Sequence, residues 1–496
     1  MIEKSKNNIV FIISLIIAVI IIIFGFLYST NLSEISSQVM GWVSYNFGWL
    51  YILGVVFFIV FLLLIAFSKY GKIKLGKDDD LPKYSNFTWF AMLFCGATGI
   101  GLVFWSIAEP LSHFVLPPSD LTPGSLDAAE FSLRTCFLHW GLTQFACFVV
   151  VGLSLAYFQY RKGKSALISN LLEPIIGPNN VNGFLGKTID IFSVVVTFCG
   201  VATSLGLGVA QICGGLNYLW DIPNNNITIL VIILAITVIF LASAISGIDK
   251  GIKFLSSVNT YLALGLLTLA FIVGPKISIL NTMISSVGQH IQYLISDLTI
   301  TSAFSDKNWI MNWRVFYYAW FIAWCPFVGL FIARISRGRT IREFIIGAVM
   351  APTIFTILWL SVFGSVALNV SGAWSLSDLA NIVSHPETAV FIVFNEYPLS
   401  RVLSFLVIVL LSVFFITSAD SATYSLSVMT SKGCLKPKKR SIVVWTIVES
   451  VMAYVLLSAG SLKPLQTISI AASLPFLVIM IVICFSVFKD IKKEFA

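Results

Sequence analysis

The chain has 496 residues, of which 58% are hydrophobic and only 11% are charged. A soluble chain of this length would carry far more charge, so the composition excludes a soluble multidomain protein. The net charge of +8 does not indicate nucleic-acid binding, because most of the 31 Lys and Arg residues lie in alternate loops between apolar segments.

Apolar segments long enough to cross a bilayer recur along the whole chain. They have the length of helices and not of the short alternating strands of a membrane barrel. The sequence therefore predicts an all-α polytopic membrane protein with twelve transmembrane helices. Within about four residues, the spans are 8–29, 49–67, 88–108, 134–158, 188–218, 228–246, 254–274, 312–334, 343–367, 400–429, 441–459 and 466–488.

The loops between these spans predict the orientation of the chain. Basic residues concentrate in every second loop, and the positive-inside rule then places both termini in the cytoplasm. Two loops on the opposite side, 275–311 and 368–399, are long enough to hold helices. Apolar positions in the first of these recur at helical spacing, which predicts an amphipathic helix lying in the interface plane.

The third span reads "CGATGIGLVFWSIAEP", with Gly96, Gly99 and Gly101 in its middle. Five spans later, the eighth carries Pro326 and Gly329. Interrupted segments at matching positions in two halves are typical of transporters built on an inverted repeat, with the substrate site at mid-membrane. Close packing of helices through small residues is the alternative.

Polar side chains in the tenth span, "FFITSADSATYSLS", suggest an ion site. Thr417 and Ser418 place hydroxyls near the membrane centre, and Asp420 places a carboxylate there. Hard oxygen ligands suit a sodium ion, and a broken third span would add backbone carbonyls. The alternative is that the hydroxyls bond only their own helix. Glu449, a second mid-span carboxylate, could pair with another helix or act in transport.

Large aromatic rings in the fourth and eighth spans could form a box for a quaternary ammonium, which donates no hydrogen bonds and is held by ring faces. Ordinary packing and interface anchoring remain the alternative, because aromatic residues make up 14% of the chain. The rings are Trp140, Phe145, Phe148, Trp320, Phe321 and Trp324.

Patterns of enzyme chemistry are not found in the sequence. The four histidines are far apart and form no HExxH motif, and no GxSxG nucleophile elbow occurs. We therefore expect neither an enzyme nor a cofactor, and interrupted helices favour a carrier over a channel.

Several stretches together resemble the betaine/choline/carnitine transporter family. The clearest is "FVGLFIARISRGRTIREFIIGAVMAP" across the eighth span and the following loop. "GIGLVFWSIAEPL", "LHWGL", "SLGLGVAQICGGL", "SGIDKGIKFLS" and "TSADS" occur in the family's order, and the resemblance covers nearly the whole chain.

The resemblance implies a leucine-transporter-like five-plus-five inverted repeat in spans 3–12. It also implies a homotrimer in the plasma membrane and secondary transport of a trimethylammonium compound, often with sodium. The corresponding division of the chain is an N-terminal pair of spans (1–87), a first repeat (88–274), a connection (275–311) and a second repeat with a short tail (312–496).

The resemblance also implies roles for individual residues. The ammonium cage falls on Trp140, Phe145, Phe148 and Phe321, with Trp320 and Trp324 lining the pathway and Phe104 near the outer gate. The backbone at Ala97, Thr98 and Gly99 would hold a carboxylate, with the Thr98 hydroxyl nearby. The main sodium site falls on the side chains of Thr417 and Ser418 and the carbonyls of Cys95, Thr98 and Phe414. A second sodium site falls on Thr203 and Phe327.

Two departures from the family pattern bear on the substrate and the coupling ion. The cage has Phe145, Phe148 and Phe321 where other members usually have Trp or Tyr, and phenylalanine holds a cation less strongly. Thr417 and Ser418 are intact, and residues 256–265 carry no basic residue that would replace sodium. We therefore expect sodium symport of a glycine betaine-like zwitterion. The alternative is a proton-coupled or exchanging carrier for choline, carnitine or a less methylated amino acid.

Overall fold

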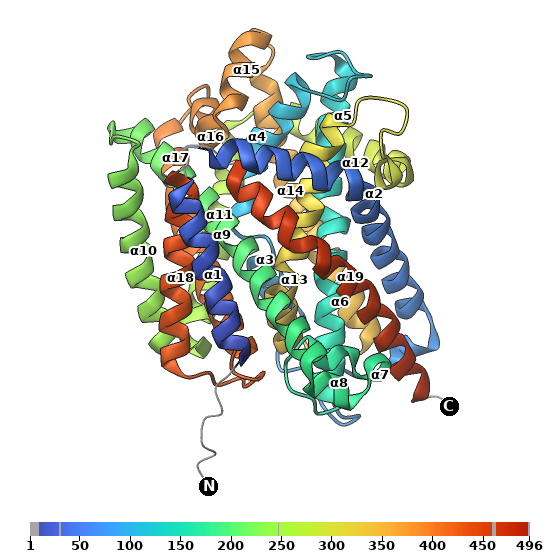
Figure 1. Cartoon of the computed structure of the whole chain (residues 1–496). Helices are drawn as coiled ribbons and strands as arrows, with labels where there is room; N and C mark the ends of the chain where they lie inside the picture. The colour runs from blue at the N-terminus through green and yellow to red at the C-terminus, as the bar shows by residue number, and fades with distance from the viewer. Residues whose placement is uncertain (1–8, 29–30, 247, 459–462, 495–496) are drawn as a thin grey trace.

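The computed structural model describes residues 9–28, 31–246, 248–458 and 463–494, and most of them are helical (Figure 1). The long helices are α1 (Ile9–Leu27), α2 (Leu32–Phe67), α3 (Asn86–Ala97), α4 (Gly99–Val115), α5 (Leu126–Leu138), α6 (Gln144–Ala156), α9 (Phe184–Trp220), α10 (Asn226–Ser246), α11 (Ile248–Val273), α12 (Lys276–Thr299), α13 (Phe316–Ile335), α14 (Ile341–Val370), α17 (Ser400–Met429), α18 (Lys439–Ser458) and α19 (Lys463–Lys493). The short helical segments are η1 (Lys69–Lys72), η2 (His139–Thr143), η3 (Tyr157–Arg161), η4 (Ser169–Leu172), α7 (Glu173–Ile176), α8 (Pro178–Asn182), η5 (Ile310–Val315), α15 (Leu376–Ser384) and α16 (Pro386–Phe394).

The number of membrane-crossing helices agrees with the predicted twelve. Within the described residues, ten helical runs are long and apolar enough to span a bilayer, and two bent helix pairs raise the number to as many as twelve. Those pairs lie at the predicted third and seventh spans. Hydropathy locates spans well because a segment in lipid must satisfy its backbone within its own helix.

The second span starts earlier than predicted. Residue 49 was the expected start, but α2 begins at Leu32 and contains 36 residues. Its first half exposes Trp42, Tyr45 and Trp49, the type of residue that anchors a helix at the membrane surface. The helix thus continues beyond its apolar stretch into the interface.

Breaks in the spans differ from those predicted. The third span is divided between α3 and α4, as expected. The eighth is not divided, because α13 runs without interruption through Pro326 and Gly329. Instead, the fourth span contains the π-helical turn η2, where Gly141 has the non-helical angles φ −105° and ψ −121°. A buried proline is tolerated because neighbouring helices enclose α13, which packs against α6, α9, α17 and α19.

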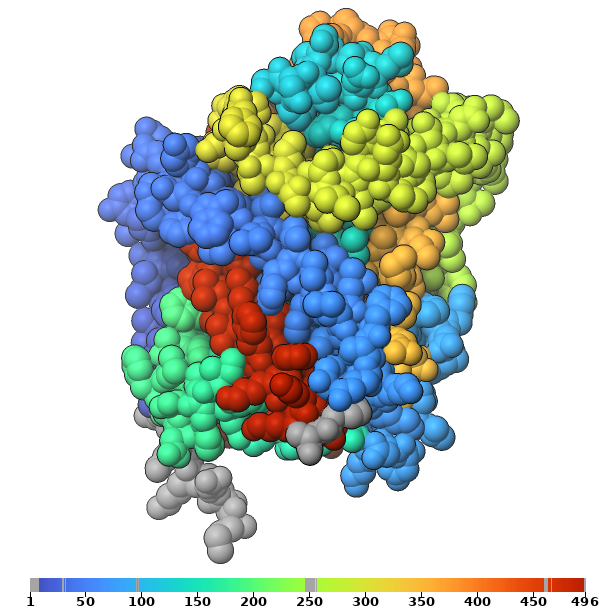
Figure 2. Space-filling model, turned by 90° about the vertical axis from the view of Figure 1, so that its right-hand side faces the viewer, coloured from blue at the N-terminus to red at the C-terminus, as the bar shows by residue number. Residues whose placement is uncertain are grey.

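The connection between the seventh and eighth spans forms helix α12. The Ser257–Val273 part of α11 makes an angle of 113° with it, and α12 packs against α5 and α14. Figure 2 shows it as a yellow band across the side of the molecule. Ile277, Ile284 and Ile291 are exposed, whereas His290 and Asp297 are buried.

The basic loops after α2, η3 and α13 gather at one end of the molecule. Backbone hydrogen bonds join the first and last of these loops: Leu75 N–H donates to Arg339 O (2.8 Å), Gly338 N–H to Leu75 O (2.9 Å) and Ile341 N–H to Ile73 O (2.8 Å). Arg161 forms an ion pair with Glu494 beyond α19. The first turn of α1 and the last turn of α19 lie at this same end, the lower one in Figure 1.

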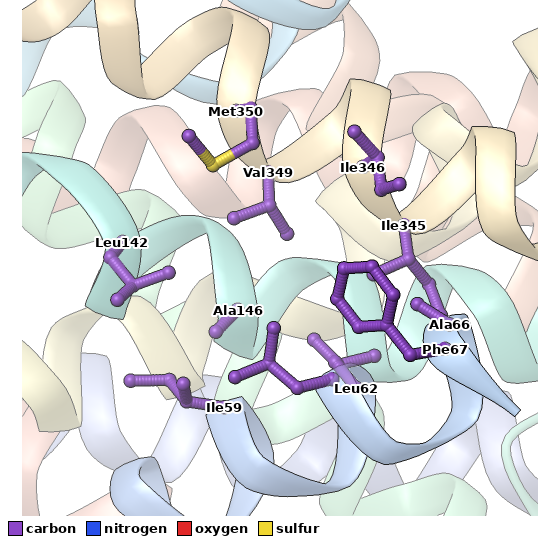
Figure 3. A pocket seen from close by; sticks show the side chains of 11 residues that line it. Ile59, Leu62, Ala66, Phe67, Leu142, Ala146, Ile345, Ile346, Val349 and Met350 are labelled. Atoms are coloured by element: carbon purple, nitrogen blue, oxygen red, sulfur yellow. The ribbon is translucent and has the colours of Figure 1, made fainter.

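An apolar groove opens on the side of the bundle between α2, α6 and α14 (Figure 3). Its empty volume is about 590 Å³. Its rim includes Leu63, Phe67 and Met350, all exposed. Because every lining side chain is apolar, we assign the groove to the lipid-facing surface, separate from the polar interior described below.

Candidate functional site

The break in the third span lies against the eighth and tenth spans. The axes of residues 86–94 and 99–115 differ by 64°. Gly99 has φ +50°, in the left-handed region that favours glycine. A Cβ atom at Gly99 would lie 3.2 Å from the Ser418 Oγ and 3.3 Å from the Trp324 ring. The backbone of the third span therefore turns beside a predicted cage ring and a predicted sodium ligand.

A small cavity, with an empty volume of about 190 Å³, lies next to this break. Gly101 allows its walls to approach, since a Cβ atom there would lie only 2.6 Å from the Trp320 ring and 2.8 Å from the Trp140 ring. Any larger residue at position 101 would push these two indoles apart. The lining residues are Thr98, Gly101, Trp140, Gln144, Trp320, Phe321 and Trp324.

The rings around this cavity meet mostly edge to face. The Trp140 ring centroid is 5.9 Å from that of Trp320, at an interplanar angle of 84°, and 5.8 Å from that of Phe321, at 67°. The indole N–H groups point away from the cavity: Trp320 donates to the Ser204 Oγ and Trp324 to the Gly200 carbonyl, each at 3.1 Å. The aromatic walls of the cavity therefore offer carbon faces rather than indole N–H donors, which suits a methylated cation.

Three of the predicted substrate residues do not line the cavity but pack on other rings. Phe148 packs edge to face on Phe321, at 6.3 Å between centroids, and Phe145 packs on Phe148 at the same distance. Phe104 packs on Trp105 at 5.0 Å. All three predicted residues are buried. The cavity lining also includes Gln144, which the sequence reasoning did not select, and Gly101, which it selected only as part of the break in the third span.

The backbone predicted to hold a carboxylate lies beside the cavity. The Thr98 side chain lines it, but its hydroxyl donates to the Phe94 carbonyl (2.7 Å), one turn earlier on its own helix. The side chains of Ala97 and Cys95, which were predicted for the substrate and the sodium site, fall outside the described residues. At this break the structure therefore describes only backbone for these two residues.

Glu109 forms a buried polar centre beside the cavity. Sequence reasoning did not find this centre. Its Oε2 accepts hydrogen bonds from the Trp140 indole N–H (2.6 Å) and the Tyr317 hydroxyl (2.5 Å). Its Oε1 lies 2.7 Å from the His139 Nδ1 and 3.2 Å from the His113 Nε2. The carboxylate thus joins α4, η2 and α13 around one cage indole.

The protonation of His139 follows from its neighbours. Arg314 Nε donates to the His139 Nε2 at 2.9 Å, so this nitrogen is an acceptor and Nδ1 carries the proton that faces Glu109. Glu109, His113 and His139 are close enough to one another to consider a metal ion. However, both nitrogens of His139 are engaged and a guanidinium occupies one side, so this group forms a hydrogen-bond network. The i, i+4 pair Glu109–His113 within a span was the signal available in the sequence.

Of the predicted sodium ligands in the tenth span, Ser418 lies at the break, whereas Thr417 contacts its own helix and α11. The Thr417 Oγ1 donates to carbonyls of its own helix, at 3.0 Å from both Val413 O and Phe414 O, and accepts from the Asn259 Nδ2 at 3.0 Å. Asn259 on α11 therefore also faces this group. Asp420, one turn along α17, accepts from the Ser243 hydroxyl (2.8 Å).

The residues of the predicted second sodium site have different neighbours. The Thr203 hydroxyl on α9 lies 2.8 Å from the Ser469 hydroxyl on α19. Phe327 packs on Trp324, at 5.0 Å between ring centroids. Both residues are buried, and whether they serve a common ion stays a prediction.

Comparison with known proteins shows similarity along the whole chain. The model of one family, described as "BCCT, betaine/carnitine/choline family transporter", matches residues 9–496. The chain is 45% identical to the glycine betaine transporter OpuD of Bacillus subtilis over 477 residues, which cover 95% of this chain and 92% of that one. It is 42% identical to a "Probable glycine betaine transporter" of Desulfitobacterium hafniense over 500 residues, with 99% of both covered. The ectoine/hydroxyectoine transporter of Virgibacillus pantothenticus is 38% identical over 494 residues, with 99% and 98% covered.

A solved structure supports the arrangement of the helices. The crystal structure of MhsT in complex with L-phenylalanine superposes with a TM-score of 0.50, covering 82% of this chain and 89% of that one at 13% identity. At this identity the likeness concerns the fold alone. It confirms the leucine-transporter-like fold predicted for the chain.

Proposed function

Because the chain belongs to the betaine/carnitine/choline transporter family, we propose that it imports a small quaternary-ammonium zwitterion, glycine betaine or a close relative, by sodium symport. That it is a multi-pass membrane transporter and not an enzyme follows from the family itself. The relatives named for glycine betaine, each more than 40% identical, support the choice of substrate.

The single observation that carries the substrate proposal is the ring cavity. Trp140, Trp320, Phe321 and Trp324 surround it, and the indole N–H groups of the three tryptophans bond elsewhere. Each ring that faces a desolvated ammonium contributes about 0.5–2 kcal/mol. The backbone at Thr98 and Gly99 would face the carboxylate of the same solute.

For sodium, the proposal relies on the approach of the tenth span to the broken third span. Ser418 lies beside Gly99, and Thr417 is one residue away on the same helix. Their hydroxyls, with the carbonyls of Cys95, Thr98 and Phe414, would supply five oxygen ligands. The ion would stabilise the arrangement that binds substrate, and the repeats 88–274 and 312–496 would then alternate access.

Orientation and assembly complete the proposal. The basic loops at one end of the molecule favour an orientation with both termini in the cytoplasm. The family resemblance favours the plasma membrane. It also favours a homotrimer, which the mass of the cross-linked protein in membranes would test.

Uptake by proteoliposomes tests the function directly. We expect the purified full-length protein to accumulate labelled glycine betaine when sodium is higher outside, and to lose this stimulation when Thr417 and Ser418 both become Ala. Ser412→Ala is the matched control, because its hydroxyl bonds the Ile408 carbonyl on the same helix away from the break. Uptake that ignores the sodium gradient would overturn the coupling, and uptake of choline or carnitine in place of betaine would overturn the substrate.

A further inference from the structure

Helices α17 and α18 bring a second set of oxygen atoms together inside the membrane. The Thr423 Oγ1 donates to the Glu449 Oε2 at 2.5 Å. Two turns further along α17, the Thr430 Oγ1 accepts from the Trp445 indole N–H at 3.0 Å. These two contacts define the antiparallel register of the pair.

Ser427 and Thr446 lie between these contacts. Ser427 is four residues after Thr423, and Thr446 is three residues before Glu449, so each shares a helix face with a residue that already contacts the partner helix. The register therefore places both hydroxyls at the α17–α18 interface, next to the Glu449 carboxylate.

Among the described residues, three oxygens of this group have no hydrogen-bond partner. They are the Ser427 Oγ, the Thr446 Oγ1 and the Glu449 Oε1. Thr423, Ser427, Thr446 and Glu449 are all 0% exposed. Ser and Thr hydroxyls in membrane helices usually bond a carbonyl one turn earlier, and open polar atoms in the membrane interior are costly. Three such atoms within about one turn of the two facing helices indicate a ligand.

The charge at this level is also uncompensated within the described residues. Helices α1 and α10, which pack against α18, contain no Lys or Arg in their described parts. Helix α9, which also packs against α18, carries only Lys187, which is exposed in its first turn. An ionised carboxylate away from water requires a positive partner or a proton.

We propose that Glu449, Thr423, Ser427 and Thr446 bind a sodium ion between α17 and α18. One carboxylate and three hydroxyls form a set of hard oxygen ligands, and the charge of the ion neutralises that of Glu449. A proton on Glu449 would neutralise the charge but leave at least one hydroxyl unpartnered. Thr423 follows Thr417 by six residues, about 9 Å along the helix, so this site is separate from the one at Thr417 and Ser418 and is independent of the proposed function.

Binding of ²²Na⁺ at equilibrium to the purified full-length protein tests the site. We expect saturable binding to persist in the Thr417→Ala/Ser418→Ala variant, and its affinity to fall at least tenfold when Glu449→Gln is added. Glu396→Gln is the matched control, because Glu396 is exposed and its loss should leave binding unchanged. Ser427→Ala and Thr446→Val should each weaken sodium binding severalfold without removing a charge. These two variants test the site if the Glu449→Gln protein does not elute as a single folded species.

Other outcomes would overturn the proposal. One is the absence of sodium binding in the Thr417→Ala/Ser418→Ala variant, and another is binding that Glu449→Gln does not change. A carboxylic-acid infrared band that Glu449→Gln removes and that sodium leaves unaltered would assign a proton to this site instead. Betaine uptake is measured separately, so a failure of the proposed function would be distinguished from a failure here.

Discussion

Two buried glutamates in the membrane-spanning helices, Glu109 and Glu449, have opposite environments. Both are 0% exposed. Glu109 has partners on both oxygens, from Trp140, Tyr317 and two histidines. Glu449 has one described donor, Thr423, and its Oε1 is open. One carboxylate completes a network, and the other leaves a position for something that the chain does not itself supply.

This difference separates two roles that a membrane carboxylate can have. A saturated carboxylate fixes the side chains around it, and Glu109 holds the N–H of a cage indole and the hydroxyl of Tyr317 on α13. An unsaturated carboxylate has capacity for a ligand. Burial alone does not distinguish the roles, whereas the count of partners does.

The largest expected effect comes from truncating the saturated carboxylate. Glu109→Ala would leave the donors of Trp140, Tyr317 and His139 buried without an acceptor, so we expect a loss of on the order of 3–5 kcal/mol in stability. Glu449→Ala deletes the same atoms but leaves only Thr423 without its acceptor, and should cost about 1–3 kcal/mol. Thermal unfolding of both variants in detergent, followed by tryptophan fluorescence, measures the difference. Equal losses would contradict the comparison.

Next in size is a change in the ring cavity that the Glu109 network holds in place. Gly101→Ala adds one methyl group where a Cβ would lie 2.6 Å from Trp320 and 2.8 Å from Trp140. The indoles must move apart, and we expect betaine affinity to fall at least tenfold, about 1.4 kcal/mol. Gly265→Ala is the control, because a Cβ there meets nothing within 4 Å. Fluorescence titration measures both affinities, and an unchanged value for Gly101→Ala would exclude these indoles from the binding site.

A smaller effect should follow from removing one indole hydrogen bond while retaining the ring. Trp320→Phe deletes the donor to the Ser204 Oγ and keeps an aromatic face toward the cavity. We expect a stability loss of about 1 kcal/mol and a severalfold loss of affinity, since phenylalanine attracts a cation less strongly. Thermal unfolding measures the loss of stability, and a betaine titration of the same sample measures the loss of affinity. A full loss of betaine binding would mean that the hydrogen bond, and not the ring, orients the site.

The smallest effect belongs to a half-buried carboxylate outside the membrane-spanning helices. Hydrogen bonds from Arg337 and from the Lys77 N–H lower the pKa of Asp80 below its ordinary value of 3.8. A lowered folded pKa adds stability above the unfolded pKa, and this contribution is lost as the pH falls through the folded value. The Asp80→Asn variant should therefore be slightly less stable than the parent chain at pH 7. In acid, where Asp80 is protonated, the two proteins should have equal stability. Thermal unfolding of both proteins across pH measures this, and a difference in stability that grows as the pH falls would contradict the prediction.

The sequence predicted the membrane helices better than their breaks. Hydropathy finds spans because lipid imposes the same backbone requirement on each of them. Pro326, however, stays inside the continuous α13, and the deviation occurs at Gly141 instead. Whether a proline or a glycine interrupts a helix depends on the neighbours that pack around it, which the local sequence does not contain.

Parts of the candidate site were predictable because they combine residues of unusual type. Trp140, Trp320, Phe321 and Trp324 were selected as rings, and the structure brings them around one cavity. The Glu109 network was not predicted, because its partners Trp140 and Tyr317 are 31 and 208 residues away. Thr98 was selected for its backbone, with its hydroxyl expected near the carboxylate, and this hydroxyl bonds its own helix in the described structure. Distant pairing and local rotamer choice are therefore what the sequence did not predict.

The three backbone hydrogen bonds between residues 73–75 and 338–341 have a mechanical consequence. They clamp the loop that follows α2 to the loop that follows α13, the helix that carries Trp320, Phe321 and Trp324. Any movement of this end of α13 would therefore be transmitted to the same end of α2. Two spin labels beside this clamp should keep one separation throughout the cycle, while a pair on α4 and α17 reports two.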